Sequence, residues 1–254
     1  MYTLITGATS GIGRSFALSL GSKGKSLILI GRNEKELKKL THFLQVKRKV
    51  EVIPIQMDLT QTDSISKLER FLEKNKIQLE MVINNAGKGL YGPFKELDLE
   101  DQENLIDLNI KAFTKLSKTV IPFMDKGGTL LQLASIAAFG PGPYMATYYA
   151  SKAYVLSFSL ALERELKKEG IKVAVLCPGP TRTAFFERAK MEKVSFAKLF
   201  YQASDEVVKY TYKQLSKNRT VIVPGIVNKM MVAGLRYLPL QVAAFLVGLT
   251  QGEK

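Results

Sequence analysis

Apolar stretches of two kinds alternate along almost the whole chain of 254 residues. Short runs rich in β-branched and aliphatic residues predict buried strands, whereas longer segments with apolar residues three and four apart predict amphipathic helices. Gly127 and Gly128 are expected to end the longest helix. The predicted strands cover residues 2–6, 26–30, 50–56, 81–84, 129–134, 171–177 and 220–223. The predicted helices cover residues 12–23, 34–46, 63–74, 100–124, 147–169 and 204–216.

Strands that alternate with helices predict βαβ units, in which consecutive strands are parallel and helices connect them. Right-handed connections then favour an α/β fold, a single doubly wound Rossmann-fold domain with a seven-stranded, mostly parallel sheet and helices on both faces. One domain of this kind commonly reaches the length of this chain. We expect the domain to cover residues 1–225, followed by an apolar C-terminal extension over residues 226–254.

Hydrophobic residues make up 46% of the chain, which is enough for a sizeable core and too many for a disordered protein. Cys177 is the only cysteine, so the chain can form no internal disulfide and nothing points to an oxidising compartment. The first residues enter an apolar strand directly, without the basic and long apolar regions of a signal peptide. We therefore expect a cytoplasmic protein.

The formal net charge is +14, and residues 1–50 carry ten lysines and arginines against only Glu34 and Glu36. Such an excess is compatible with nucleic acid, an anionic membrane surface or a phosphate-rich ligand as partner. We favour a lysine-rich surface in water, because many of these residues fall at helical spacing. The sequence has no zinc-finger spacing, nucleic-acid module or cluster of metal ligands, so we expect neither nucleic-acid binding nor a metal site.

A glycine-rich turn follows the first predicted strand, in the sequence TGATSGIG at residues 6–13. Glycines let the backbone approach a pyrophosphate closely, and the N-terminus of the next helix supplies N–H groups and a positive dipole. Glycines also serve ordinary tight turns, but this position between a first strand and its helix favours a dinucleotide site. The residues expected to bind the cofactor here are Gly7, Thr9, Ser10, Gly11, Ile12 and Gly13.

The end of the second predicted strand indicates which dinucleotide binds. An acidic residue at this position normally accepts both hydroxyls of the adenosine ribose, but here Gly31, Arg32 and Asn33 follow the strand. A guanidinium suits a 2′-phosphate, so we predict that Arg32 selects NADP(H) over NAD(H). The alternative is that Arg32 only decorates the start of the next helix.

Tyr148 and Lys152 are four residues apart and therefore share one face of a predicted helix. An ammonium beside a phenol favours the phenolate, so Lys152 is expected to lower the pKa of Tyr148 and make it a usable proton donor and acceptor. The adjacent Tyr149 is one residue off this spacing and is expected to point elsewhere. Ser135 ends a predicted strand, at the edge where open α/β sheets bind ligands, and its hydroxyl can hold a reacting oxygen.

Several short motifs stand in the order typical of one family. They are the glycine turn, Asp58 after the third strand, the sequence NNAG at residues 84–87, Asn109, Ser135, Tyr148 with Lys152, and the turn at Pro178 and Gly179. Over about residues 1–225 the chain resembles the short-chain dehydrogenase/reductase family. The resemblance implies an NADP(H)-dependent oxidoreductase that interconverts an alcohol and a carbonyl group, working as a homodimer or homotetramer. A non-catalytic NADP-binding sensor or scaffold protein is the alternative.

The resemblance also implies a role for each residue of a catalytic set. Tyr148 would donate a proton to the carbonyl oxygen during reduction. Lys152 would lower the pKa of Tyr148 and bind the nicotinamide ribose. Ser135 would hydrogen-bond the substrate oxygen, and Asn109 would keep a water molecule in a proton relay to Lys152.

Further cofactor contacts are implied at three strand ends. Residues after the third strand would flank the adenine, the NNAG segment would pass beside the adenosine ribose, and the segment after the Pro-Gly turn would hold the carboxamide. These residues are Asp58, Leu59, Asn85, Ala86, Gly87, Pro178, Gly179, Thr181 and, for the carboxamide itself, Thr183.

By the same resemblance, residues 136–146 and 184–203 would form the substrate pocket. Both segments are apolar and aromatic, which favours an apolar ketone, aldehyde or alcohol as the small-molecule substrate. An amphipathic helix that packs on the core explains the composition of these segments equally well.

The C-terminal segment 228–252 is the least typical part, and it carries no charged residue from Tyr237 to Gly252. The segment is short for a spanning helix and is interrupted by Pro239. Three interpretations are open, namely a helix over the substrate mouth, an oligomer contact, and a peripheral membrane contact aided by the basic charge.

Overall fold

The structure is a computed structural model that describes residues 1–182 and 201–252. Within these residues the strands form one seven-stranded sheet in the order β3-β2-β1-β4-β5-β6-β7, and all neighbours pair in parallel. The predicted doubly wound α/β fold is therefore confirmed, and the strand order reverses between β1 and β4. The strands are β1 (Tyr2–Thr6), β2 (Ser26–Gly31), β3 (Val52–Gln56), β4 (Leu79–Asn84), β5 (Met124–Leu133), β6 (Lys172–Leu176) and β7 (Val221–Ile222).

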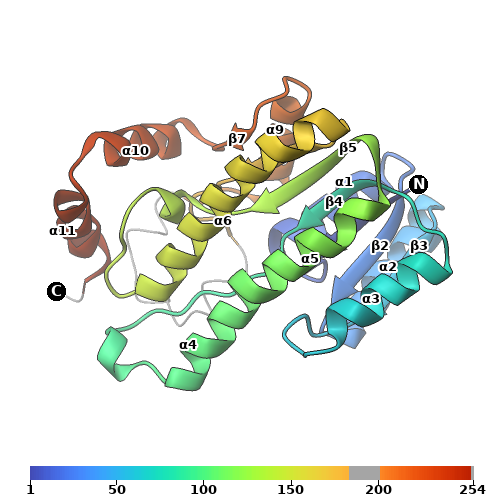
Figure 1. The fold of residues 1–254 in the computed structure, drawn as a ribbon, viewed down its shortest axis with the longest axis horizontal. Coiled ribbons are helices and arrows are strands. Elements are labelled where there is room, and N and C mark those ends of the chain that lie inside the picture. Colours follow the sequence, from blue (N-terminus) through green and yellow to red (C-terminus); the bar gives the residue numbers. More distant parts are fainter. Residues whose placement is uncertain (183–200, 253–254) are drawn as a thin grey trace.

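Helices cover both faces of the sheet (Figure 1). Short 3-10 segments stand in the connections, and α4, a π-helical turn and α5 follow one another as a single long rod. One face is covered by α1 (Gly11–Gly21), α2 (Glu34–Arg48) and α9 (Ser204–Leu215). The other is covered by α3 (Ser64–Lys74), α5 (Phe113–Val120) and α6 (Ala146–Leu166). The remaining segments here are η1 (Phe94–Glu96), α4 (Leu99–Ile106), the π-helical η2 (Asp107–Ala112), η3 (Ile121–Phe123), η4 (Ile136–Phe139) and η5 (Lys167–Glu169).

Successive side chains along a strand enter opposite layers of the core, because they alternate across the sheet. In β1, Leu4 packs with residues of α3 and α5, whereas Ile5 packs with residues of α1 and α2. In β2, Ile28 lies in the same layer as Leu4, and Leu29 lies in the same layer as Ile5. All four side chains are fully buried, which explains why these strands read as continuous apolar runs in the sequence.

The prediction that Gly127 and Gly128 end the long helix is wrong. The helical rod ends with η3, and β5 already begins at Met124. Pro122 lies in η3, and proline cannot continue an α-helix because it lacks the backbone N–H. Gly127 has φ +86° and stands where the pairing of β4 with β5 changes register. The two glycines therefore form an irregularity inside the strand.

The C-terminal extension consists of α10 (Ile226–Tyr237) and α11 (Leu240–Gln251), which lie next to each other at one end of the molecule (Figure 1). Pro239 separates the two helices. Ala243 is fully buried and lies over Gly140, in the connection that leads to α6. Among the described residues, no helix is long and apolar enough to cross a membrane.

Candidate active site

A cavity of about 430 Å³ lies beyond the carboxyl ends of the strands, at the point where the strand order reverses. In open α/β sheets this is the usual place for a ligand. Almost every residue that the sequence indicated lines this cavity. The exceptions are Gly13 and Asn109, which stand behind its wall, and Thr183, which lies outside the described residues together with most of segment 184–203.

The glycine turn forms one end of the cavity. Gly7 and Gly11 have φ of +62° and +52°, a backbone region that favours glycine. A Cβ on Gly13 would stand 2.4 Å from the carbonyl oxygen of Gly7, so only glycine lets α1 pack this closely on the turn. Ser10 does not cap α1 with its side chain, and the first turn of α1 contains no acidic residue. The N-terminus of α1 therefore suits phosphate groups.

Asn85 ties the end of β4 to this turn. Its Nδ2 donates hydrogen bonds to the carbonyl oxygens of Thr6 and Gly7, at 2.8 and 3.2 Å. The Thr6 hydroxyl accepts hydrogen bonds from the backbone N–H groups of Asn85 and Ala86. The Asn85 side chain thus fixes the end of β4 against the glycine turn, and residues 85–87 line the cavity between them.

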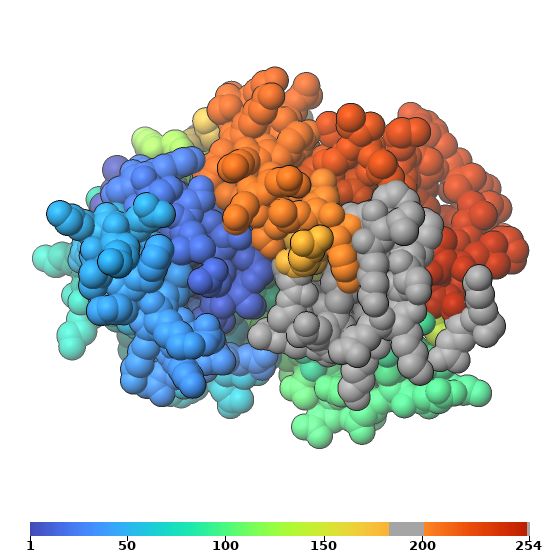
Figure 2. Space-filling model, turned by 180° about the vertical axis from the view of Figure 1, so that it is seen from behind, coloured from blue at the N-terminus to red at the C-terminus, as the bar shows by residue number. Residues whose placement is uncertain are grey.

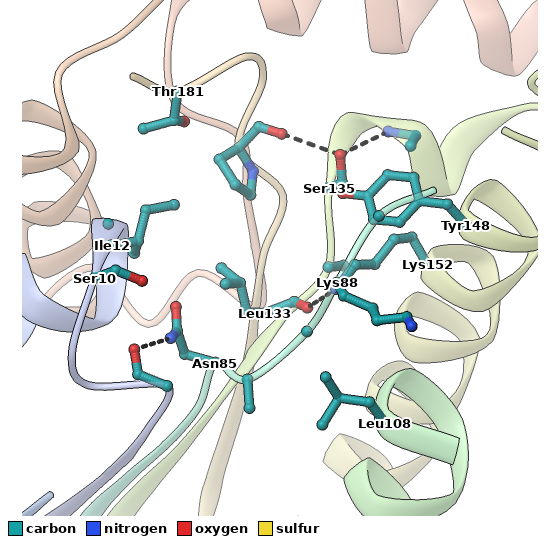
Figure 3. Close-up of a pocket in the computed structure, with 18 of the residues that line it drawn as sticks. Ser10, Ile12, Asn85, Lys88, Leu108, Leu133, Ser135, Tyr148, Lys152 and Thr181 are labelled. Carbon is teal, nitrogen blue, oxygen red and sulfur yellow. Dashed lines mark hydrogen bonds between the residues drawn. The ribbon is translucent and has the colours of Figure 1, made fainter. Parts of the chain in front are cut away.

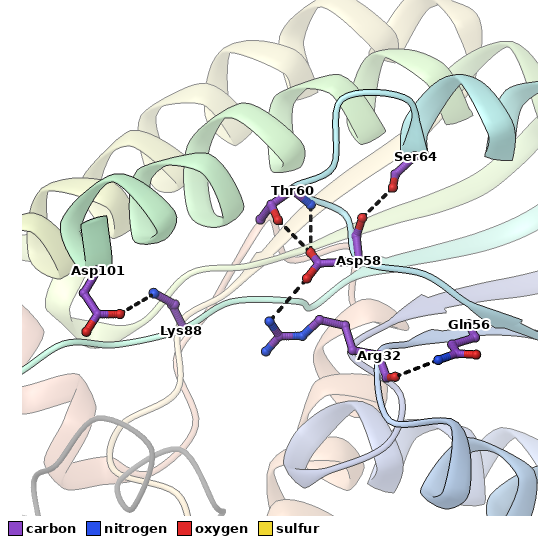
Figure 4. Close-up of polar contacts among 7 residues, drawn as sticks. All are labelled: Arg32, Gln56, Asp58, Thr60, Ser64, Lys88 and Asp101. Atoms are coloured by element: carbon purple, nitrogen blue, oxygen red, sulfur yellow. Dashed lines mark hydrogen bonds and ion pairs between the residues drawn. The ribbon is translucent and has the colours of Figure 1, made fainter. Parts of the chain in front are cut away.

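Arg32 and Asp58 lie side by side at the far end of the cavity (Figure 4). The distance from Arg32 Nη1 to Asp58 Oδ2 is 3.5 Å, and Asp58 Oδ1 accepts hydrogen bonds from the backbone and hydroxyl of Thr60. Partial burial alone would raise the pKa of Asp58, but the bonds from Thr60 and the Arg32 guanidinium outweigh it, so the pKa lies below its usual value. The carboxylate is therefore charged and orients the guanidinium of Arg32.

Ser135 and Tyr148 meet at the inner end of the cavity (Figure 3). The phenol of Tyr148 is hydrogen-bonded to the hydroxyl of Ser135. Ser135 Oγ also accepts a bond of 3.1 Å from the Ala137 N–H and lies 3.4 Å from the carbonyl oxygen of Pro178. Ser135 stands two residues after the end of β5 and caps η4, so its hydroxyl is held near the strand end. Two hydroxyls from distant segments thus converge on one point.

Lys152 lies one helical turn after Tyr148 and is buried, with its Nζ donating a hydrogen bond of 2.9 Å to the Leu133 carbonyl oxygen. Nζ stands 5.8 Å from the centre of the Tyr148 ring. Burial lowers the pKa of Lys152 to about 8. The expectation that Lys152 lowers the pKa of Tyr148 is not met in this structure. Burial of the phenol raises the Tyr148 pKa, and the hydrogen bond to Ser135 offsets this only in part.

Asn109 stands in the π-helical turn η2 and is buried. Its Oδ1 accepts from the Lys88 N–H at 3.0 Å, and its Nδ2 donates to the Lys88 carbonyl oxygen and to Ser151 Oγ at 2.9 and 3.0 Å. A Cβ on Gly87 would lie 3.2 Å from Asn109 Oδ1 and 3.4 Å from Lys152 Nζ. The Asn109 side chain therefore fixes the strand-end segment that passes beside Lys152. Helical spacing alone gave no sign of the π-helical turn.

The cavity also contains residues that the sequence analysis did not assign. Lys88, directly after the NNAG motif, lies 3.3 Å from Asp101 and lines the wall next to Lys152. Tyr149 lines the cavity too, contrary to the expectation that it points elsewhere, and it is hydrogen-bonded to Gln251 of α11. The tail contributes Met231, Leu235, Val247, Thr250 and Gln251 to the lining. A helix over the substrate mouth is the one interpretation of the tail that these contacts support.

The remaining predicted residues belong to the turn that follows β6. Pro178, Gly179 and Thr181 line the cavity, and the Thr181 hydroxyl donates to the carbonyl oxygen of Gly179 at 2.9 Å. A Cβ on Gly179 would collide with Asn228, because α10 packs on this turn. Cys177, just before the turn, is fully buried, and burial raises its pKa to about 12.

The parallel sheet, the glycine turn on α1 and the hydroxyl cluster together define a Rossmann-fold oxidoreductase. Residues 2–193 match the short chain dehydrogenase family, and the chain belongs to that family.

Two relatives are similar to this chain in sequence. An uncharacterised oxidoreductase of Staphylococcus epidermidis is 31% identical over 76% of this chain and 86% of its own. The very-long-chain 3-oxoacyl-CoA reductase of Rattus norvegicus is 29% identical over 84% of this chain and 67% of its own.

Two solved structures are similar as well. A short-chain dehydrogenase from Sphingobium yanoikuyae in complex with NADPH has 33% identity and a TM-score of 0.82, with 89% of both chains covered. A bulky-bulky ketone specific alcohol dehydrogenase from Comamonas testosteroni has 29% identity and a TM-score of 0.77, over 94% of this chain and 98% of its own.

Proposed function

We propose that the protein is an NADPH-dependent oxidoreductase that interconverts a carbonyl group and an alcohol. The observation that carries the proposal is the hydrogen-bonded pair of Ser135 and Tyr148 at one end of a cavity whose other end is a glycine turn on a helix N-terminus. Bound there, the cofactor supplies the hydride, and the protein supplies position and proton transfer.

Tyr148 would be the proton donor during reduction. A phenol with its usual pKa of about 10 is already protonated at neutral pH, and burial raises the pKa of Tyr148 further, so the group carries the proton that a carbonyl oxygen needs. Ser135 would hold the same oxygen, because its hydroxyl lies against the phenol. Lys152 would place an ammonium beside the cofactor ribose and Tyr148, and Asn109 would position the neighbouring segment around Lys88.

The cofactor preference rests on the end of β2. Arg32 faces the cavity, is oriented by Asp58, and has no acidic neighbour in the segment Gly31–Asn33 that could bind a free ribose diol. The relative from Sphingobium yanoikuyae, solved with NADPH, supports the same choice. Turnover measured with NADPH and NADH at equal concentration tests this part, and a clear preference for NADH would contradict it.

The substrate is a bulky apolar ketone, aldehyde or alcohol in this proposal. The cavity beyond Tyr148 is bounded by Met145, Tyr149, Leu235 and Val247, all apolar or aromatic. The ketone-reducing relative from Comamonas testosteroni and the reductase of long-chain oxoacyl groups from Rattus norvegicus act on large substrates by their names. Cytoplasmic location and assembly into a homodimer or homotetramer stay predictions.

The decisive experiment replaces Tyr148 by Phe. NADPH oxidation with a graded series of ketones should fall by at least a factor of about 100, since general acid catalysis contributes that much or more. NADPH binding, followed by fluorescence, should change little. Tyr154→Phe is the matched control, because Tyr154 lies on the same helix and bonds to Thr114 outside the cavity. Equal turnover in both variants would refute the role of Tyr148.

The alternative function, a non-catalytic NADP-binding sensor, makes a different prediction for the unmodified protein. It should bind NADPH tightly yet fail to oxidise it with any ketone or aldehyde of the series, and no alcohol should reduce NADP.

A further inference from the structure

α10 and α11 lie at one end of the molecule (Figure 1), and in the space-filling view of Figure 2 they are the red part of the surface. Many of their large apolar side chains are exposed and together form an apolar surface on the outer sides of the two helices. Tyr237, the last residue of α10, is 90% exposed, and Phe245 and Leu249 on α11 are 65% and 67% exposed. Soluble proteins rarely leave contiguous apolar patches of this kind uncovered. The other large side chains of this surface are Ile226, Val227, Met230, Leu240, Val242 and Leu246.

α11 is apolar on both of its sides. It contains no charged residue, and its only polar residues are glutamines and a threonine. The inner side of α11 buries Ala243 and lines the cavity with Val247, while Phe245 and Leu249 face outward. A helix that is apolar all round is normally covered on all sides. The cavity accounts for its inner side, and the outer side still needs an apolar environment.

The charge around this surface has one sign. From Val207 to Gly252 the sequence has no Asp or Glu, but it has six Lys and Arg residues. Three of them, Arg219, Lys229 and Arg236, line a hollow of about 370 Å³ between α9, β7 and α10. None of the three pairs with a carboxylate of the described residues. Unneutralised cations beside exposed aromatic and aliphatic side chains suit the phosphates and acyl chains of a lipid surface.

We propose that the outer surface of α10 and α11 docks the protein peripherally on an anionic phospholipid membrane. Phe245, Leu249 and their neighbours would enter the boundary between headgroups and acyl chains, with Tyr237 at the level of the headgroups. Arg219, Lys229 and Arg236 would take the headgroup phosphates. The contact lies on the membrane surface and does not span it.

A second copy of the chain fits this surface less well. Two-fold symmetric association would bring the same patch of each copy together, with the three cations of one copy near those of the other. The membrane offers the opposite charge, so it satisfies both the apolar and the basic residues.

Vesicle co-sedimentation tests the apolar part of the proposal. The full-length protein should bind vesicles that contain phosphatidylglycerol, and Phe245→Ser with Leu249→Ser should weaken binding by roughly tenfold or more, because two apolar side chains no longer leave water. The control is Phe94→Ser with Leu99→Ser, since these side chains are 67% and 71% exposed elsewhere on the surface. All four positions are exposed, and unfolding temperatures of the variants check that the fold is kept.

The charge part has its own matched pair. Lys229→Gln with Arg236→Gln should weaken binding to phosphatidylglycerol vesicles by roughly tenfold or more, since each cation near an anionic surface strengthens binding about fivefold. Lys35→Gln with Lys47→Gln removes the same charge from α2, away from the proposed contact. This control should weaken vesicle binding by less than about half the factor found for the α10 variant. Vesicles of phosphatidylcholine alone should bind weakly. Inorganic phosphate should compete poorly, which separates a membrane from a free phosphate ion as ligand.

Three outcomes would overturn the proposal. One is the absence of binding to anionic vesicles. Another is an equal loss of binding in the tail variants and in their controls. The third is a stable dimer in light scattering that the Phe245→Ser and Leu249→Ser changes dissociate, because a second copy would then cover this surface. None of these readouts depends on catalytic turnover.

Discussion

Replacing Lys152 by Met should raise the stability of the protein near neutral pH while it abolishes turnover. Lys152 is buried, and its Nζ donates a hydrogen bond to the carbonyl oxygen of Leu133. No carboxylate of the described residues forms an ion pair with it. A buried ammonium with so little compensation costs folding free energy. Met fills nearly the same space without the charge.

The size of this cost follows from the pKa. Burial lowers the pKa of Lys152 from 10.5 to about 8, a difference that corresponds to on the order of 3 kcal/mol. The unfolded chain holds the proton more strongly, so the full cost applies below about pH 8 and disappears as the pH rises toward the unfolded value. The free energy of unfolding of the wild type should therefore rise with pH in this window. The loss of the bond to Leu133 subtracts about 1 kcal/mol from the gain in the Met variant.

Urea unfolding of cofactor-free protein measures the effect. At about pH 7, Lys152→Met should be more stable than the wild type by roughly 2 kcal/mol, and the advantage should vanish by about pH 10. Lys168→Met is the control, because Lys168 is exposed in η5, just after α6. The free energy of unfolding of Lys168→Met should differ from that of the wild type by the same amount at both pH values.

The result that would refute this reasoning is a Lys152→Met variant destabilised to the same extent at both pH values. The buried ammonium would then cost nothing, and the lowered pKa would have no bearing on stability. A gain at neutral pH joined to a loss of turnover would mark Lys152 as a residue kept for chemistry at the expense of stability.

Three further substitutions test other parts of the site, and a fourth, on α10, is a control. Arg32→Ser should raise the KM for NADPH by roughly 10- to 100-fold, as expected for the loss of a charge-assisted bond, with little change in the KM for NADH. Gly13→Ala should lower the free energy of unfolding by about 1–3 kcal/mol and abolish cofactor binding, because its Cβ would meet the Gly7 carbonyl oxygen at 2.4 Å. Gly234→Ala, in open space on α10, should instead stabilise by about 0.5–1 kcal/mol. Asn109→Ala should destabilise by about 2 kcal/mol in thermal or urea unfolding, because it leaves the buried backbone groups of Lys88 unpaired.

The sequence by itself determined the order of strands and helices, because strands buried on both faces read as apolar runs and amphipathic helices keep their spacing. It also determined the glycine turn, since only glycine accepts the backbone of Gly7 and Gly11 and the close approach at Gly13. The residues that meet in the cavity could be named for the same reason: they stand at the carboxyl ends of parallel strands, which share one edge. The end of the long helix was predicted within one residue but ascribed to the wrong residues, because Pro122, and not the two glycines, stands where the helix stops.

Only the tertiary structure decided what surrounds each of these residues. The pKa of Tyr148 lies above its usual value and that of Lys152 below it, because burial depends on packing from distant segments and not on the spacing of four residues. The place of the C-terminal tail was also decided by packing, because its composition was compatible with a helix over the substrate mouth, an oligomer contact or a membrane contact. Contacts of α11 with Tyr149 and the cavity wall give it an inner and an outer side, and this division arises only when residues far apart in the chain come together.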